Sequence, residues 1–408
     1  MHRPGLVVAC LFLAAGWSSA ASPDPADLVA PAETQVKARA LVRRLGSEEF
    51  AEREAAQKQL AALGRHARPA LLAGATTNPD PEIRSRCGQL LPNATELERR
   101  ARLDTFLADT EGRYDHDLPG WAAFRNVACS EWSFLGHTVV ADRTLRKAAR
   151  EVFAELTATP ANRELLRAAD ESKFTLGEQI VARKLALYRP RDSDAPSPSV
   201  QDVAALAFAE ARAGTQHVTR RAVAVENLIE TSGLGAVARG DNDRGKVYRA
   251  LVVAWIRAQV TPREMADAMR VAARLGMTDL AADLAARILV MPGIVTGVVR
   301  SSAIQTLVSY GTRRQIPILE QLGDRLGAVH TVTKGPAKYL VLLRDVTLGL
   351  SIALSEQKLT DYGFSDLEAT ATDSPPQSYS YRRYYFEDDA ARQTAFAKWA
   401  AWRKAHAD

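Results

Sequence analysis

The chain has 408 residues, and its 53 Lys and Arg against 48 Asp and Glu give a formal net charge of +5. So small an excess of positive charge, spread along the whole chain, does not indicate nucleic-acid binding. Ala, Leu, Arg and Glu are abundant, and apolar residues recur at spacings of three and four, which predicts an all-α protein.

The first 21 residues are predicted to be a signal peptide. Arg3 precedes an apolar run from Leu6 to Ala15, and small residues follow where a signal peptidase requires them. Cleavage after Ala20 or Ala21 predicts an exported protein, in the periplasm or outside the cell. No later stretch approaches the roughly 20 uninterrupted apolar residues of a transmembrane segment. Residues 22–32, rich in Pro, Ala and Asp, are predicted to be a disordered leader.

A repeated phrase marks residues 33–92. The phrase is Arg-x-x-small-x-x-x-Leu, and its two copies, 31 residues apart, are Arg53-x-x-Ala56-x-x-x-Leu60 and Arg84-x-x-Cys87-x-x-x-Leu91. Helical spacing places the small residue and the Leu of each copy on one face. Each copy therefore predicts a helix that buries this face against a neighbouring helix.

The segments around the two copies, Leu45–Gly64 and Ala67–Leu91, resemble the paired helices of HEAT-repeat proteins. This resemblance implies helical hairpins stacked into an irregular superhelix. The end of the chain is similar to the end of a group of exported bacterial HEAT-like proteins of unassigned activity. Lys338–Phe364, expected to form one long apolar helix, and the tail from Ala390 to Trp399 carry this second resemblance, which assigns no functional residue.

Looser copies of the phrase begin at Arg146, Arg221 and Arg300, without a fixed period. Composition completes the predicted organisation: a helical segment over 93–188, a linker or loop over 189–199, an irregular helical repeat region over 200–364, a flexible loop over 365–378, and an aromatic, basic tail with a C-terminal helix over 379–408.

Helix ends are predicted from capping residues. Starts are expected at Asp80 before Pro81 and at the capping boxes Thr95-x-x-Glu98 and Thr261-x-x-Glu264. Stops are expected at Gly46, Gly64, Gly276 and Gly311.

Five ionisable residues crowd one loop before Pro119: Asp109, Glu111, Asp115, His116 and Asp117. Carboxylates at this density can bind Ca²⁺ or supply a general acid and base, so the loop is a candidate site for a hydrolase or a metal-dependent enzyme. The alternative is a solvated loop that caps a helix. Four aromatic residues follow, which we expect in the core rather than on a ligand platform: Trp121, Phe124, Trp132 and Phe134.

The tail interleaves aromatic and basic side chains at Tyr381, Arg382, Arg383 and Tyr384. Such a segment can hold a cell-envelope polysaccharide, a peptide or an anionic polymer. The alternative is that the aromatic rings dock the last helix onto the body of the protein.

Other motifs lack residues that their chemistry needs. Gly240-x-x-x-x-Gly245-Lys246 is followed by Val247, where a phosphate-binding loop needs a hydroxyl. Ser355-x-x-Lys358 has no companion motif of the Ser-Lys enzymes. Whether a disulfide joins Cys87 and Cys129 stays open.

The sequence therefore predicts an exported HEAT-like protein that binds a protein or peptide partner as a scaffold or adaptor, with no cofactor and no nucleic acid. The rival functions are an enzyme at the loop 109–117 and a polysaccharide binder at the tail. The partner's identity and the oligomeric state stay open.

Overall fold

Helices account for most of the chain in the computed structural model, which describes residues 23–140, 143–171, 175–188, 197–213, 225–292, 295–322, 327–364 and 380–406. The predicted all-α class is confirmed. The predicted signal peptide, most of the linker over 189–199 and the loop over 365–378 lie outside the described residues. The chain divides into two compact units, residues 1–116 and 117–408. None of the described helices is both long and apolar enough to cross a bilayer.

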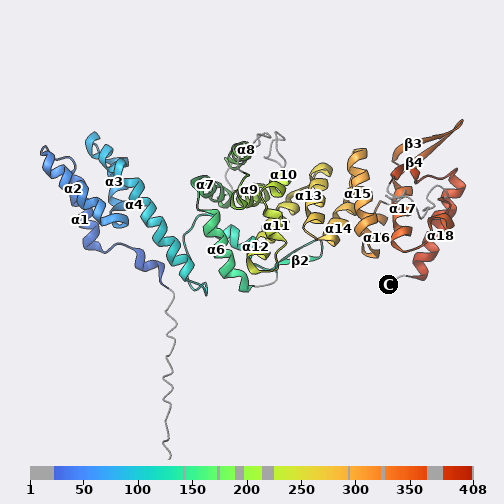
Figure 1. The fold of residues 1–408 in the computed structure, drawn as a ribbon, viewed down its shortest axis with the longest axis horizontal. Helices are drawn as coiled ribbons and strands as arrows, with labels where there is room; N and C mark the ends of the chain where they lie inside the picture. The colour runs from blue at the N-terminus through green and yellow to red at the C-terminus, as the bar shows by residue number, and fades with distance from the viewer. Residues whose placement is uncertain are drawn as a thin grey trace, which may run out of the picture. The chain divides into compact units, whose positions relative to one another are not determined.

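The first unit is built from consecutive helices that pack on one another (Figure 1). In chain order they are the 3₁₀-helix η1 (Pro25–Leu28), α1 (Ala32–Arg44), α2 (Phe50–Leu63), η2 (Gly64–Ala67), α3 (Arg68–Thr77) and α4 (Pro81–Ala108). α1 packs against α2 and α3, and α3 lies against α4. The predicted start of α4 is confirmed, because Asp80 Oδ1 accepts a hydrogen bond of 2.8 Å from the backbone N–H of Glu82.

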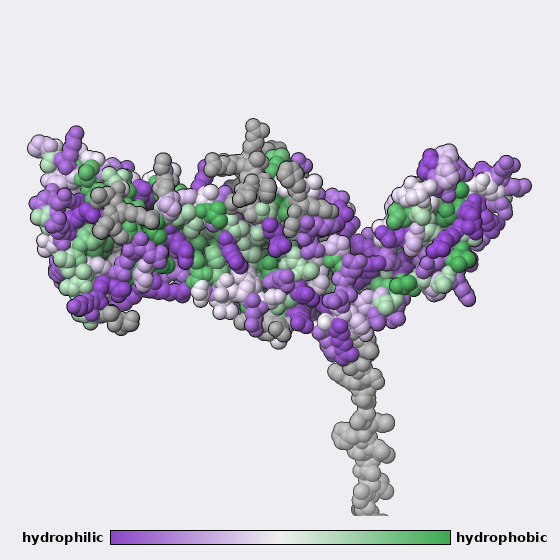
Figure 2. Space-filling view, turned by 180° about the vertical axis from the view of Figure 1, so that it is seen from behind, coloured by the Kyte–Doolittle hydropathy of each residue, from purple (hydrophilic) through white to green (hydrophobic). Residues whose placement is uncertain are grey.

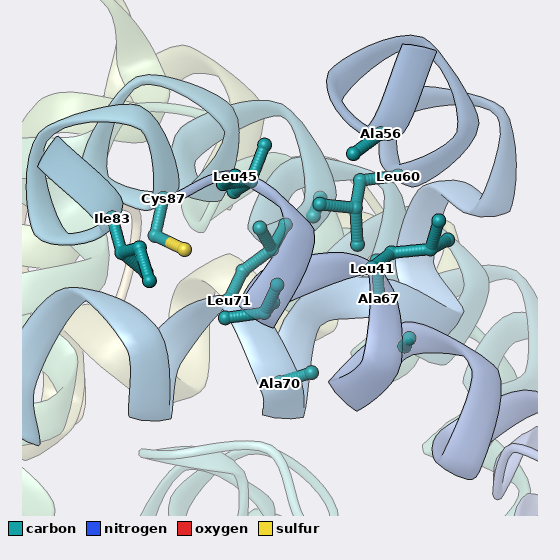
Figure 3. Close-up of a cluster of buried hydrophobic side chains, with 12 residues drawn as sticks. Leu41, Leu45, Ala56, Leu60, Ala67, Ala70, Leu71, Ile83 and Cys87 are labelled. Carbon is teal, nitrogen blue, oxygen red and sulfur yellow. The ribbon is translucent and has the colours of Figure 1, made fainter. Parts of the chain in front are cut away.

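The two copies of the repeated phrase contribute to the core of this unit (Figure 3). Ala56 and Leu60 of α2 and Cys87 of α4 are at most 1% exposed and pack with Leu41 of α1. Leu91 packs against the same cluster and is partly buried. The predicted burial of one face of each helix is thus confirmed.

The arginine that begins the phrase holds the preceding turn. Arg53 is the fourth residue of α2, and its Nη1 donates to the carbonyl oxygens six and five residues earlier, at 2.8 and 2.9 Å. Arg84, the fourth residue of α4, makes the same pair of bonds at 2.8 and 2.7 Å. In the second unit, Arg163 of α7 repeats the pair at 3.1 and 2.9 Å, and Arg300 of α15 keeps one bond, to the carbonyl of Val295 at 3.0 Å. The phrase beginning at Arg221 lies partly outside the described residues.

The second unit contains the remaining helices and two short antiparallel hairpins. Its elements are α5 (Trp121–Ala128), β1 (Trp132–Phe134), β2 (His137–Val140), η3 (Arg143–Leu145), α6 (Arg146–Leu156), α7 (Pro160–Asp170), α8 (Leu176–Leu187), α9 (Val200–Ala213), α10 (Val225–Thr231), α11 (Leu234–Ala238), α12 (Asp243–Ala258), α13 (Pro262–Arg274), α14 (Thr278–Val290), α15 (Gly297–Tyr310), η4 (Arg313–Gln315), α16 (Ile316–Glu320), β3 (Ala328–Lys334), β4 (Ala337–Leu342), α17 (Leu343–Leu354), η5 (Leu359–Tyr362), η8 (Tyr381–Arg383) and α18 (Asp389–Ala405). From α12 to α15 each helix packs against the next one in the chain (Figure 1).

The core of the second unit surrounds α9, in which every residue from Val203 to Ala209 is fully buried. The ring of Phe124 lies 5.4 Å from that of Phe153 and 5.7 Å from that of Phe208, measured between centroids. Trp121, 5% exposed, joins the same aromatic cluster. The expectation that these aromatic residues are core is confirmed for Trp121 and Phe124, whereas Trp132 and Phe134 of β1 are only partly buried.

The long apolar helix predicted over Lys338–Phe364 is wrong. Its first part is strand β4, paired antiparallel with β3, and only Leu343–Leu354 is α-helical. Gly335, with φ +57°, allows the tight turn between the two strands. A short apolar run fits either a strand or a buried helix, and here the neighbouring β3 decides.

The domain boundary predicted at residue 92 falls inside α4, which continues through Pro92 to Ala108. The predicted capping box at Thr95 therefore lies within a helix, where Glu98 pairs with Arg102 at 2.7 Å. Packing of α4 against α1, α2 and α3 outweighs the loss of one helical hydrogen bond at Pro92. The boundary between the two units lies at residues 116 and 117.

The leader predicted to be disordered is ordered where the structure describes it. Asp24 Oδ1 accepts from the backbone N–H of Ala26 at 2.8 Å and caps η1. Arg65 of η2 donates to the carbonyl oxygen of Leu28 at 2.5 Å and ties the segment to the first unit. The leader's own composition cannot reveal a contact supplied by a residue this far along the chain.

Candidate functional site

The acidic loop after α4 is organised around one buried carboxylate. Asp109 is fully buried, and it accepts hydrogen bonds from the backbone N–H groups of Arg113 at 2.9 Å and Tyr114 at 3.1 Å. Its Oδ2 also lies 3.0 Å from Nε2 of His116, whose ring packs edge-on against Phe106 at 5.3 Å. Asp109 therefore closes the loop on itself.

The other acidic residues of the loop point to solvent. Glu111 is exposed and pairs with the Arg113 guanidinium at 2.6 Å, and Asp115 and Asp117 are exposed. Within the described ranges, no three His, Cys, Asp or Glu side chains are placed to hold a metal ion. Of the four acidic residues of the loop, Asp109 is thus buried and bonded within the loop, whereas Glu111, Asp115 and Asp117 are exposed.

The tyrosines of the predicted ligand surface are buried. Tyr381 is 9% exposed and Tyr384 is fully buried, so of the two alternatives these rings do not form an open aromatic surface. The ring of Tyr384 packs directly on Gly349 of α17 and lies 5.9 Å from the ring of Phe364. Burial raises the pKa of the Tyr384 hydroxyl. Tyr384 can be buried because Gly349 has no side chain, which leaves room for the ring.

The arginines of the same segment have a different environment. Arg382 is exposed and Arg383 is half-buried, and both line an open pocket of about 500 Å³ beside the β3–β4 hairpin. We call it the hairpin pocket; it is lined by His330, Thr331, Val332, Thr333, Ser380, Arg382, Arg383 and Tyr385.

Aromatic contacts fix the wall of the hairpin pocket. Tyr385 stacks on Tyr339 of β4 at 5.1 Å, and Lys334 at the end of β3 lies 5.3 Å above the ring of Tyr385. The ring of His330 meets that of Tyr381 edge-on at 6.1 Å. These contacts hold η8 against one face of the hairpin, so the two arginines are presented from a packed support.

A second pocket, of about 570 Å³, lies between the ends of α15 and α17. Its floor is apolar, with Val308, Leu350 and Leu354, and Arg313 and Arg314 line its rim. Arg314 already lies 3.2 Å from the buried Asp283 and donates to the carbonyl of Leu135 at 2.9 Å. Arg313 donates to the carbonyl of Ser355 at 3.5 Å and lies 3.9 Å from the Glu356 carboxylate, so both arginines make internal contacts.

Exposed apolar residues do not mark a competing site. The most exposed of the large ones are on or next to different helices: Val29, Val36, Phe50 and Val298. On the described part of the face in Figure 2, hydrophobic and hydrophilic residues alternate over short distances. Isolated apolar residues of this kind are normal on protein surfaces.

Comparison of this chain with protein-family models, curated proteins and solved structures finds no match. The functional assignment therefore depends on the geometry of the chain itself.

The sequence analysis identifies Arg382 and Arg383 of the hairpin pocket as part of a ligand surface. It does not predict strand β3, which lines the pocket with them. The available signal is the group of β-branched residues Val329, Thr331, Val332 and Thr333, followed by Gly335 and Pro336, which is typical of a strand and a turn.

The remaining motif fragments have structural roles. Asn242 caps α12 by accepting from the backbone N–H of Gly245 at 2.7 Å, and Ser355 Oγ donates to the carbonyl of Ile352 at 2.7 Å. Cys87 and Cys129 are both free and buried, and they belong to different units.

Proposed function

We propose that this chain is an adaptor or scaffold that binds a partner protein, and that the hairpin pocket takes part in the contact. The observation that carries the proposal is a strand edge and two guanidinium groups, those of Arg382 and Arg383, around one open volume of about 500 Å³. A strand edge offers backbone donors and acceptors to a peptide, and arginine is enriched in protein interfaces.

We include in the same proposal that the helices form HEAT-like hairpins. Helices in both units carry an arginine at their fourth position that bonds back to the preceding turn, at Arg53, Arg84, Arg163 and Arg300. This recurrence supports HEAT-like hairpins of one pattern. Stacked hairpins offer extended surfaces, which suit a macromolecular partner better than a small substrate.

Export is also part of the proposal. The charged start, apolar run and small residues of positions 1–21 support it. Intact mass spectrometry of the protein from its host is expected to show a chain that begins at Ala21 or Ser22. A cytoplasmic chain that retains residues 1–21 would contradict export.

The partner contact is tested by co-purification from the native host. We expect wild type to recover a stoichiometric partner, and Arg382→Glu/Arg383→Glu to recover roughly tenfold less, because charge reversal opposes an oppositely charged partner. The matched control is Lys37→Glu/Lys404→Glu, which reverses two exposed charges of α1 and α18 that do not line the pocket. Equal recovery by both variants would exclude the pocket as the contact, and partner-free protein from every fraction would contradict the adaptor function.

A further inference from the structure

We infer that the pocket between the ends of α15 and α17 binds a free apolar α-amino acid as its zwitterion. This site is distinct from the hairpin pocket, and the inference does not depend on the adaptor function. We call it the α15–α17 pocket. Its lining residues, all in the described part of the chain, are Val308, Gly311, Thr312, Arg313, Arg314, Leu350, Ala353, Leu354, Glu356 and Tyr384.

The first support is the apolar floor of the α15–α17 pocket. Leu350 of α17 is buried, and Val308 of α15 and Leu354 of α17 are half-buried. The volume of about 570 Å³ is within the range of small-molecule sites. An aliphatic or aromatic side chain that covers this floor removes apolar surface from water. The floor therefore favours a ligand with an apolar side chain.

The second support is a pair of opposite charges at the rim. Nη2 of Arg313 lies 3.9 Å from Oε2 of Glu356, and the two side chains are 61% and 88% exposed. So long and exposed a contact contributes little to stability. An α-amino acid carries a carboxylate and an ammonium group on one carbon atom. Its carboxylate can pair with Arg313 while its ammonium group pairs with Glu356, so that each charge lies next to an opposite one.

The two arginines of the rim are not equally available. Arg314 lies 3.2 Å from the buried Asp283, so its charge is already paired inside the protein. Arg313 donates to the carbonyl of Ser355 at 3.5 Å and lies 3.9 Å from Glu356, and both of these contacts are long. In the described chain both use Nη2 alone. The other N–H groups of the Arg313 guanidinium can therefore donate to a ligand carboxylate.

The third support is the backbone at Glu356, whose φ of +64° is uncommon for a residue with a side chain. The N–H of Glu356 donates to the carbonyl of Ala353 at 2.9 Å, and the N–H of Gln357 donates to that of Ile352 at 3.2 Å, which ends α17. Glycine is the usual residue at this position of a helix end. Strained residues are concentrated at functional sites. A ligand that needs a carboxylate at the rim explains why glutamate is kept here.

The test titrates the full chain with L-leucine, L-methionine and L-phenylalanine in isothermal calorimetry. We expect saturable binding of at least one of them, and an affinity roughly tenfold lower or less for three analogues of it, exemplified here by leucine. Glycine lacks the apolar side chain, N-acetyl-L-leucine lacks the ammonium group, and L-leucinamide lacks the carboxylate. If none of the three amino acids binds at millimolar concentration, the inference is wrong. Equal binding of an analogue would exclude the contact that the analogue lacks.

Two variants assign the rim charges to the two head groups. Arg313→Gln should weaken leucine binding roughly tenfold but leave leucinamide binding unchanged, because leucinamide has no carboxylate. Glu356→Gln should weaken leucine binding similarly but leave N-acetyl-leucine binding unchanged. The matched controls are Arg100→Gln and Glu111→Gln, which neutralise exposed charges of the first unit and should bind leucine like wild type. A variant that weakens leucine and its matched analogue equally would contradict the assignment.

A third variant separates binding from folding. Glycine adopts the φ of Glu356 without strain, so Glu356→Gly should not lower the midpoint of thermal unfolding. Its affinity for leucine should nevertheless fall as far as that of Glu356→Gln, because both variants lack the carboxylate. Saturating leucine should raise the unfolding midpoint of wild type and have little effect on that of Glu356→Gly. Leucine binding by Glu356→Gly with wild-type affinity would overturn the zwitterion site.

Discussion

Three arginines make the same pair of hydrogen bonds at the starts of three different helices. In each case the donor is Nη1 of the fourth residue of a helix, and the acceptors are the carbonyl oxygens six and five residues earlier. Carbonyls in a tight turn have no helical partner, so one guanidinium satisfies two of them at once. The residue is thus a brace for the turn that precedes its helix.

Removal of this brace has a measurable cost. We expect Arg84→Met to lower the free energy of unfolding by about 1 kcal/mol, since it removes two solvent-accessible charge-assisted bonds while the aliphatic stem is kept. Urea unfolding of the full chain measures it. Arg100→Met, which changes a 67% exposed side chain paired only with Glu96 among the ion pairs of the described chain, should cost about half as much or less. Equal effects would contradict the brace.

The buried cysteines are expected to be unreactive. Burial raises the pKa of the Cys87 thiol to about 11, and burial also raises the pKa of Cys129. Without residues 1–21, the native chain should react with a thiol reagent only slowly, and the rate should rise about tenfold per pH unit through pH 9. The reaction rate rises with pH because these thiols are protonated below their raised pKa and only the thiolate reacts. A rate that levels off near the usual thiol pKa of about 8.5 would contradict it.

Cys87 also fills the space that Gly74 leaves free. A Cβ at position 74 would lie 2.6 Å from Sγ of Cys87 and 3.0 Å from a methyl of Val42. We expect Gly74→Ala to destabilise the first unit by about 1–3 kcal/mol, through overpacking. Cys87→Ala removes the sulfur, so the double variant should cost less than the sum of the two single changes. Strict additivity in urea unfolding would show that α3 and α4 move apart instead.

At the scale of whole elements, several helix ends are predicted from local capping residues, whereas the long helix expected over Lys338–Phe364 begins as a strand. Thr261 and Glu264 form the expected capping box of α13, and Gly276, with φ +77°, follows its end. Such ends depend on atoms within a few residues. The β3–β4 hairpin depends in addition on the η8 segment, which is distant in sequence, and the apolar pattern of β4 alone does not distinguish a strand from a helix.

The candidate site, too, can be predicted only in part from the sequence. A basic segment at Arg382 and Arg383 is visible in the sequence, because the charge of the side chains is known without the fold. The burial of Tyr384 is not visible, because it depends on the glycine that α17 places beneath the ring. The role of Asp109 as a loop brace follows from backbone N–H groups, which leave no sequence signal.

The contact between α17 and Tyr384 gives an element-scale prediction. A Cβ at Gly349 would lie 2.4 and 2.5 Å from two ring carbons of Tyr384. We expect Gly349→Ala to displace the ring, to destabilise the protein by about 1–3 kcal/mol and to speed hydrogen exchange of residues 380–386. Gly88→Ala is the control. No atom lies within 4 Å of its added Cβ, and in mid-helix it should stabilise α4 by up to about 1 kcal/mol. Unchanged exchange at 380–386 would contradict the docking of η8 through Tyr384.

At the scale of the whole molecule, the first unit has a hydrophobic cluster of its own. Its buried members come from α1 to α4 and the turns between them. A fragment of residues 23–116 is therefore expected to be helical and to unfold cooperatively by itself, with a urea midpoint close to that of the first unit in the full chain. Circular dichroism measures both. An unfolded fragment at 25 °C would mean that the second unit is needed for its stability.

The sequence distance between bonded residues sets an order of events during synthesis. In the first unit, Arg65 reaches back 37 residues to Leu28, whereas in the second Arg314 reaches back 179 residues to Leu135. At a synthesis rate of about 5–20 residues per second, roughly 10–40 s pass between the synthesis of Leu135, in the β1–β2 turn, and that of Arg314. The first unit can fold while the second is still being made. The hairpin then spends that interval as nascent chain, exposed to chaperones and proteases.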